Sequence, residues 1–196
     1  MPYIQKQDRE KFAALIETTI GVLRDDNDNP YLKGEFFGYF VNRLARKFLG
    51  TQDYTNVAFN SSFFNESKKK ALENAADSIA VQLVRSDPMS AAGELNYAIS
   101  AVYWGFLGDK EGVAAAKYGM RAYLNGILDK IVSNIDTISA GAGNAKDATM
   151  MFRRIIVVRG VLDHIKFETY RRVTMYYEDE KRMENGDVWT TGKLQA

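Results

Sequence analysis

The sequence predicts an all-α protein, a single-domain bundle of about six helices that ends in a long C-terminal helix. Apolar residues recur at intervals of three and four through nearly every segment, which is the spacing of one face of a helix. Only three prolines interrupt this pattern. The length of 196 residues suffices for one continuous core and is short for two, so we expect one domain, residues 1–196.

The first three helices are predicted from their apolar faces and their end signals. Residues 8–23 and 34–49 each carry large apolar side chains at helical spacing. Gly50 supplies a stop signal for the second helix, because glycine tolerates the left-handed conformation that ends helices. Residues 65–85 form the third predicted helix, and Asn65 is a favoured N-cap.

The remaining helices are predicted over residues 93–108, 113–135 and 148–183. The small, glycine-rich segment 139–145 is the predicted flexible joint before the last helix. One stripe is expected to face the core along the whole last helix: Ile155, Val158, Leu162, Ile165, Thr169, Val173, Tyr176 and Met183.

Two parts of the chain resemble each other. Phe48, Leu49 and Gly50 at the end of the second helix align with Phe106, Leu107 and Gly108 at the end of the fourth, and another helix follows each. Residues 34–85 and 93–135 could therefore be a duplicated helix–loop–helix unit. The alternative is that helices in general share such a pattern.

Composition excludes several kinds of protein. With 26 Lys and Arg against 25 Asp and Glu, the net charge is +1, which favours neither nucleic acid nor an anionic membrane as a partner. The absence of cysteine excludes disulfides, thiolate zinc sites and thiol nucleophiles. No stretch approaches the roughly 20 apolar residues of a membrane span, and no signal sequence is evident at the start. We expect a cytosolic protein with no membrane partner.

No catalytic residue, metal ligand or cofactor is predicted. His164, the single histidine, lies one turn before Glu168, a spacing that suits a metal pair but lacks further ligands. A histidine paired with a carboxylate on a helix surface is the plainer interpretation. The carboxylate pairs Glu73 with Asp77, and Glu180 with Glu184, leave a metal-dependent nucleotide hydrolase as an alternative.

The basic residues of the last helix are the more suggestive feature. Arg171 and Arg172 follow Tyr170, and arginine binds phosphate through a planar fork of donors while tyrosine can stack on a base. If one of the two arginines faces another helix, its charge needs a partner, and Glu94 is the predicted one. The alternative is that Glu168 pairs with Arg171 or Arg172 by one-turn contacts on a solvated face.

Three stretches of the chain resemble a family of small uncharacterised proteins from tailed phages and metagenomes: "MPYIQKQDR" at 1–9, "GELNYAI" at 93–99 and "FETYRRVTMYYEDEKRMENGDV" at 167–188. The resemblance implies a phage context and a cytosolic helical protein, and it implies no chemistry. Members of that family look shorter, so the additional helices here depart from it. Eight residues at motif positions are the candidate ligand-binding residues: Glu94, Asn96, Tyr97, Glu168, Tyr170, Arg171, Arg172 and Tyr177.

We therefore expect a phage-encoded, non-enzymatic binding protein that sequesters or inhibits a host protein or a small phosphorylated ligand such as a nucleotide. The alternatives are the metal-dependent nucleotide hydrolase and a virion or assembly component. Self-association into a homo-oligomer is expected from 11 Phe, 11 Tyr and 2 Trp, because interfaces favour aromatic residues. The segment "AVYWGFL" at 101–107 is the predicted interface.

Overall fold

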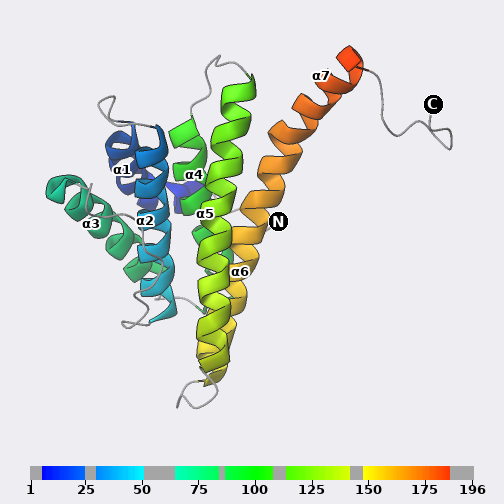
Figure 1. Cartoon of the computed structure of the whole chain (residues 1–196). Helices are drawn as coiled ribbons and strands as arrows, with labels where there is room; N and C mark the ends of the chain where they lie inside the picture. The colour runs from blue at the N-terminus through cyan, green and yellow to red at the C-terminus, as the bar shows by residue number, and fades with distance from the viewer. Residues whose placement is uncertain are drawn as a thin grey trace.

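The protein is a helical bundle, as predicted. The computed structural model describes residues 6–24, 30–50, 65–83, 87–107, 114–141 and 148–185, and within these ranges every regular element is a helix (Figure 1). The order is α1 (Lys6–Leu23), α2 (Pro30–Leu49), α3 (Glu66–Leu83), α4 (Ala92–Leu107), α5 (Ala114–Gly141), α6 (Ala148–Thr169), a π-helical turn η3 (Tyr170–Thr174) and α7 (Met175–Asn185).

Local signals set the helix ends. Pro30 opens α2 four residues before the predicted start, because its fixed φ suits the first helical position. Gly50 ends α2 with a φ of +75°, and its amide donates to the carbonyl of Arg46 at 3.1 Å. At the start of α3 the side-chain oxygen of Asn65 accepts from the amide of Ser67 at 2.8 Å, which confirms the predicted cap.

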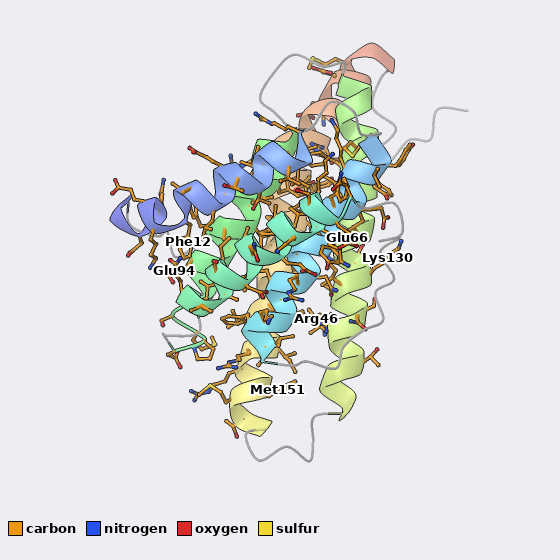
Figure 2. All side chains as sticks on the ribbon, turned by 90° about the vertical axis from the view of Figure 1, so that its left-hand side faces the viewer. Phe12, Arg46, Glu66, Glu94, Lys130 and Met151 are labelled. Carbon is orange, nitrogen blue, oxygen red and sulfur yellow. The ribbon has the colours of Figure 1, made fainter. Side chains whose placement is uncertain are left out.

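The core lies where α2 meets its neighbours. Phe37, Phe40 and Leu44 of α2 are fully buried, as is Phe12 of α1. Helix α1 packs on α3 and α4, while α2 packs on α3 and α5. Figure 2 shows the side of the bundle that α1 and α3 cover, with Phe12 and Glu94 labelled near the crossing of α1 and α4.

Helices α4, α5 and α6 form the other side of the bundle. Helix α6 packs against both α4 and α5, and α7 continues its path beyond the bundle (Figure 1). Helix α5 is longer than predicted and includes residues 139–141 of the predicted joint. Residues 142–145 of that joint lie outside the described residues.

The predicted C-terminal helix is helical throughout 148–183, but it is not uniform. Five residues of the predicted stripe, from Ile155 to Thr169, are buried. Met183 is 80% exposed, so its predicted place in the core is wrong. The wider π turn changes the helical register, and α7 reaches beyond the bundle (Figure 1). The side chains of Val173 and Tyr176 lie outside the described ones.

The aromatic segment 101–107 packs into the protein's own core. Val102 and Tyr103 are fully buried, and Trp104 and Phe106 are half-buried against the core. The Tyr103 ring meets Phe37 edge to face, with centroids 5.6 Å apart. Much of the surface of these rings is therefore used inside the protein. Self-association remains a prediction. The duplicated helix–loop–helix unit and the single domain also remain predictions. Across the described residues, no helix combines the length and the apolar character that crossing a membrane requires.

Candidate functional site

A cluster of charged side chains lies on the π turn and on the end of α6. The hydroxyl of buried Thr169 donates to the carbonyl of Ile165 at 2.7 Å, and such a bond perturbs the regular helical ladder. The next residues, Tyr170 to Thr174, form the π turn. Tyr170, Arg171 and Arg172 are all exposed on it. Turns of this kind are frequent at functional sites.

Glu168 holds both arginines. Arg171 donates to the two carboxylate oxygens through Nε at 3.2 Å and Nη2 at 3.0 Å, and Arg172 donates through Nε at 2.9 Å. The carboxylate is 15% exposed, while the arginine side chains are 53% and 58% exposed. Hydrogen bonds from Arg171 and then Arg172 lower the pKa of Glu168 to about 2. Three ionised groups in contact thus give this cluster a net charge of +1.

Trp104 of α4 also contacts Arg172. The guanidinium carbon lies 5.9 Å from the centroid of the tryptophan ring, which is a cation–π contact. Arg172 is therefore held by a carboxylate on its own helix and by an aromatic face on a neighbouring helix.

Tyr170 is tied to α7. Its hydroxyl donates to Glu178 at 3.1 Å, and this hydrogen bond raises the pKa of Tyr170. On the same helix, Arg182 pairs with Asp179 at 3.1 Å. Tyr177 lies on α7, but its side chain is outside the described ones.

The predicted pairing of Glu94 with the arginines is wrong. Glu94 accepts a hydrogen bond from Lys11 of α1. Neither arginine is buried, and both reach Glu168, because residues three and four positions further along a helix lie on the same face. The plainer alternative, one-turn pairing with Glu168, is confirmed for both Arg171 and Arg172.

The candidate residues whose side chains the structure describes do not all lie together. Helices α4 and α6 run in the same direction, so Asn96 near the start of α4 lies beside His164, while Trp104 near its end lies beside Arg172. Asn96 accepts from Ser100 at 3.0 Å. Tyr97 faces α1, where Arg9 lies 5.7 Å from its ring centroid. Glu94 and Tyr97 thus fix α1 on α4, and the arginine cluster is separate.

One of the two carboxylate pairs considered for metal chemistry, Glu73 with Asp77, has other partners. Glu73 accepts from the Tyr39 hydroxyl, and Asp77 accepts from Arg43 through Nε at 2.7 Å and Nη2 at 2.8 Å. Burial is the largest single effect on Asp77 and opposes its ionisation, but the hydrogen bonds and positive charges of Arg43 and Lys47 together outweigh it and lower the pKa of Asp77. Within the described residues, no three His, Asp or Glu side chains gather closely enough to hold a metal ion.

His164 and Glu168 do not pair either. Glu168 is engaged by the arginines, and within the described part of the chain the buried Nε2 of His164 has no hydrogen-bond partner. The side chain of Glu184 lies outside the described ones.

Sequence reasoning missed the residues that other helices bring to the site. Trp104 was expected at an interface between copies, and neither Lys11 nor Arg9 was singled out. Arg121 is only 2% exposed, although nothing in its sequence context indicates burial. Its charge lies near Tyr103, whose burial raises the pKa of its hydroxyl to about 12.

Residues 123–188 match the family model described as Domain of unknown function (DUF6899). The match covers about a third of the chain and runs from Tyr123 of α5 through α6, the π turn and α7. It includes the arginine cluster and excludes Glu94, Asn96 and Tyr97. No curated protein and no solved structure matches the chain.

Proposed function

We propose that this protein is a non-enzymatic binding protein that sequesters a small phosphorylated ligand, a nucleotide, on Arg171 and Arg172. The observation that carries the proposal is the anchoring of both guanidinium groups by Glu168 on an exposed π turn. Each arginine side chain remains more than half exposed, so a ligand in solution can reach it.

The cluster suits phosphate chemically. Glu168 engages both Nε atoms, and a planar guanidinium presents further N–H donors beyond that edge. Because Glu168 and Trp104 restrict Arg172, less conformational entropy is lost when it binds an anion. The net charge of +1 favours an anion, and the half-exposed ring of Tyr170 could stack on a base.

Two further observations support the proposal. The family match includes the arginine cluster, so this part of the chain is shared with other proteins. One of the two carboxylate pairs that a hydrolase could use, Glu73 with Asp77, is engaged by Tyr39 and Arg43. In the phage context implied by the sequence resemblance, a cytosolic protein that binds nucleotides without turnover would act by sequestration.

Isothermal titration calorimetry tests the proposal directly. Inorganic pyrophosphate and a panel of nucleoside monophosphates and triphosphates would be titrated into the wild type and into Arg171→Gln and Arg172→Gln. We expect saturable binding to the wild type and a loss of about tenfold or more in each variant, because each removes charge-assisted hydrogen bonds. The melting temperature should change little, since both side chains are exposed.

Arg182→Gln is the matched control, because Arg182 is 56% exposed and also pairs one turn away, with Asp179. It should bind as the wild type does. No binding by the wild type, or equal losses in Arg182→Gln, would contradict the proposal. Magnesium-dependent release of phosphate from a nucleotide would favour the hydrolase instead, and recovery of the protein in purified particles would favour a virion component.

A further inference from the structure

One face of α6 carries large apolar side chains that stay in contact with solvent. Phe152, Ile156 and Phe167 are 56%, 48% and 61% exposed, and the two phenylalanines are the exposed ones among the described residues. Gly160 lies between them in sequence, four residues after Ile156 and seven before Phe167. Steps of four and seven residues are about one and two helical turns, so these residues form one stripe. Exposed apolar stripes of this kind often mark interaction surfaces.

Gly160, at the centre of the stripe, leaves the helix backbone open to close approach. An added Cβ atom would meet nothing within 4 Å outside the helix's own backbone. The distance between two packed helices depends on the side chains at the point of contact, so a glycine there lets the axes come close. The groove beside Gly160 extends the apolar surface to Met89, which is 54% exposed.

The two phenylalanines make the stripe complementary to itself. Phe152 lies eight residues before Gly160 and Phe167 lies seven after it, which are distances of about 12 and 10.5 Å along the helix. When a second copy of α6 crosses antiparallel at Gly160, Phe152 of each copy comes beside Phe167 of the other. A two-fold interface requires such self-complementarity, and paired aromatic rings attract each other.

The charges around Gly160 favour the antiparallel arrangement. Arg159 and Asp163 are 53% and 49% exposed and lie on the same flank of the stripe, in addition to their ion pairs within the chain. An antiparallel copy sets this flank against its own equivalent, so each Arg159 comes near the other copy's Asp163. A parallel copy would set it against the opposite flank, where Arg153 and His164 offer no negative charge to Arg159.

We infer that a second copy of this chain packs on this face, and that the α6 helices of the two copies cross antiparallel at Gly160. The centre of the interface is apolar, and Arg159 and Asp163 lie at its rim, as is usual for interfaces. The dimer accounts for the self-association expected from the aromatic content, on a surface other than residues 101–107. It goes beyond the proposed nucleotide binding, because none of its contacts involves the arginine cluster.

Sedimentation equilibrium of single variants tests the surface. We expect the wild type to dimerise, and Phe152→Ser and Phe167→Ser each to raise the Kd of the dimer about tenfold or more, as loss of an aromatic side chain from an interface centre does. Val81→Ser is the matched control, because Val81 of α3 is apolar and 56% exposed, and it should keep the wild-type Kd. All three side chains are exposed, so the melting temperature of each monomer should change little.

A substitution at Gly160 tests the close crossing. Gly160→Leu places a bulky side chain between the two helices and should also raise the Kd of the dimer about tenfold or more. Gly126→Leu is the matched control, because Gly126 of α5 is also a helical glycine with open space around an added Cβ atom. It should dimerise as the wild type does.

Cysteine cross-linking tests the orientation, since the chain contains no cysteine of its own. Phe152→Cys is mixed with ¹⁵N-labelled Phe167→Cys, a short bis-maleimide is added, and the intact mass shows which chains are joined. We expect mixed cross-links between the two variants. Each variant alone should cross-link little, because equivalent residues of the two antiparallel copies lie more than about 20 Å apart along the helices.

Each remaining outcome overturns the inference. These outcomes are a monomeric wild type at about 0.1 mM, an equal rise of the Kd in Val81→Ser, unchanged dimerisation of Gly160→Leu, or cross-links that join each cysteine variant mainly to itself. Calorimetry with phosphorylated ligands measures a different property on different residues, so either proposal can fail alone.

Discussion

At the scale of single residues, the arrangement around Glu168 determines what the arginines can do. An exposed arginine normally samples many rotamers, and ordering it costs conformational entropy. Here one carboxylate fixes Arg171 and Arg172 together, and the Trp104 ring contacts Arg172 as well. Surface ion pairs contribute little to stability, so the effect of this cluster lies mainly in orienting its donors.

The pKa of Glu168 tests this arrangement. It is lowered from 4.5 to about 2, so the stabilising contribution of the ionised carboxylate is complete above about pH 4.5 and is lost as the pH falls through 2. Replacing both Arg171 and Arg172 with Gln should raise the pKa of Glu168 toward its ordinary value. A carboxyl-carbon NMR titration measures it, with Arg182→Gln as the control. An unchanged pKa in the double variant would show that the two ion pairs do not form in solution.

Single-residue contacts were predictable from the sequence only where both partners were close along the chain. Glu168 with Arg171 and Arg172, and Asn65 capping its own helix, follow from spacing alone. The bond from Lys11 to Glu94 joins residues far apart in sequence, and several carboxylates could have taken that place.

At the scale of the elements, apolar spacing predicted each helix because a buried face imposes its period on the sequence. The π turn was not predictable, since no residue pattern distinguishes Tyr170–Thr174 from a regular helix. It lies where α6 continues into α7 (Figure 1). Thr169, the last residue of the stripe before the π turn, is buried.

Packing of α2 on α5 depends on Gly34. A Cβ atom there would collide with the ring of Tyr123, which is held edge to face by Tyr31 at 5.2 Å and by a hydrogen bond to Glu35 at 2.7 Å. Gly34→Ala should therefore lower the free energy of unfolding by about 1–3 kcal/mol, as overpacking does. Urea denaturation measures this change.

Gly126→Ala provides the comparison, because Gly126 has open space around an added Cβ. It should raise the free energy of unfolding by up to about 1 kcal/mol, since alanine favours helix more than glycine. Equal changes in the free energy of unfolding for the two substitutions would mean that the Tyr123 ring moves aside and that Gly34 is not a close contact.

At the scale of the whole molecule, the all-helical class was predictable, whereas the assembly of candidate residues into a site was not. The sequence suggested that Glu94 pairs with Arg171 or Arg172. Because α4 and α6 run in the same direction, the start of α4 lies beside His164 and only its end lies beside Arg172. The aromatic content suggested an interface at residues 101–107, yet Tyr103 is fully buried there and Trp104 and Phe106 are half-buried against the core. Composition indicates how many aromatic residues must be placed and not which of them face solvent.

Self-association therefore needs direct measurement. The heavy aromatic content still predicts a homo-oligomer, and sedimentation velocity at tens of micromolar covers the range of moderate interfaces. We expect a species larger than the 22.1 kDa monomer. A single monomeric species across that range would refute the prediction.

The central claim is that the arginine cluster on the π turn holds a phosphorylated ligand. Native mass spectrometry of the protein purified from cells that produce it tests this claim most directly. We expect the wild type and Arg182→Gln to carry an adduct whose fragments include phosphate, and the double variant Arg171→Gln with Arg172→Gln to lack it. A wild-type protein without any adduct, or a phosphorylated adduct that the double variant retains, would contradict the account.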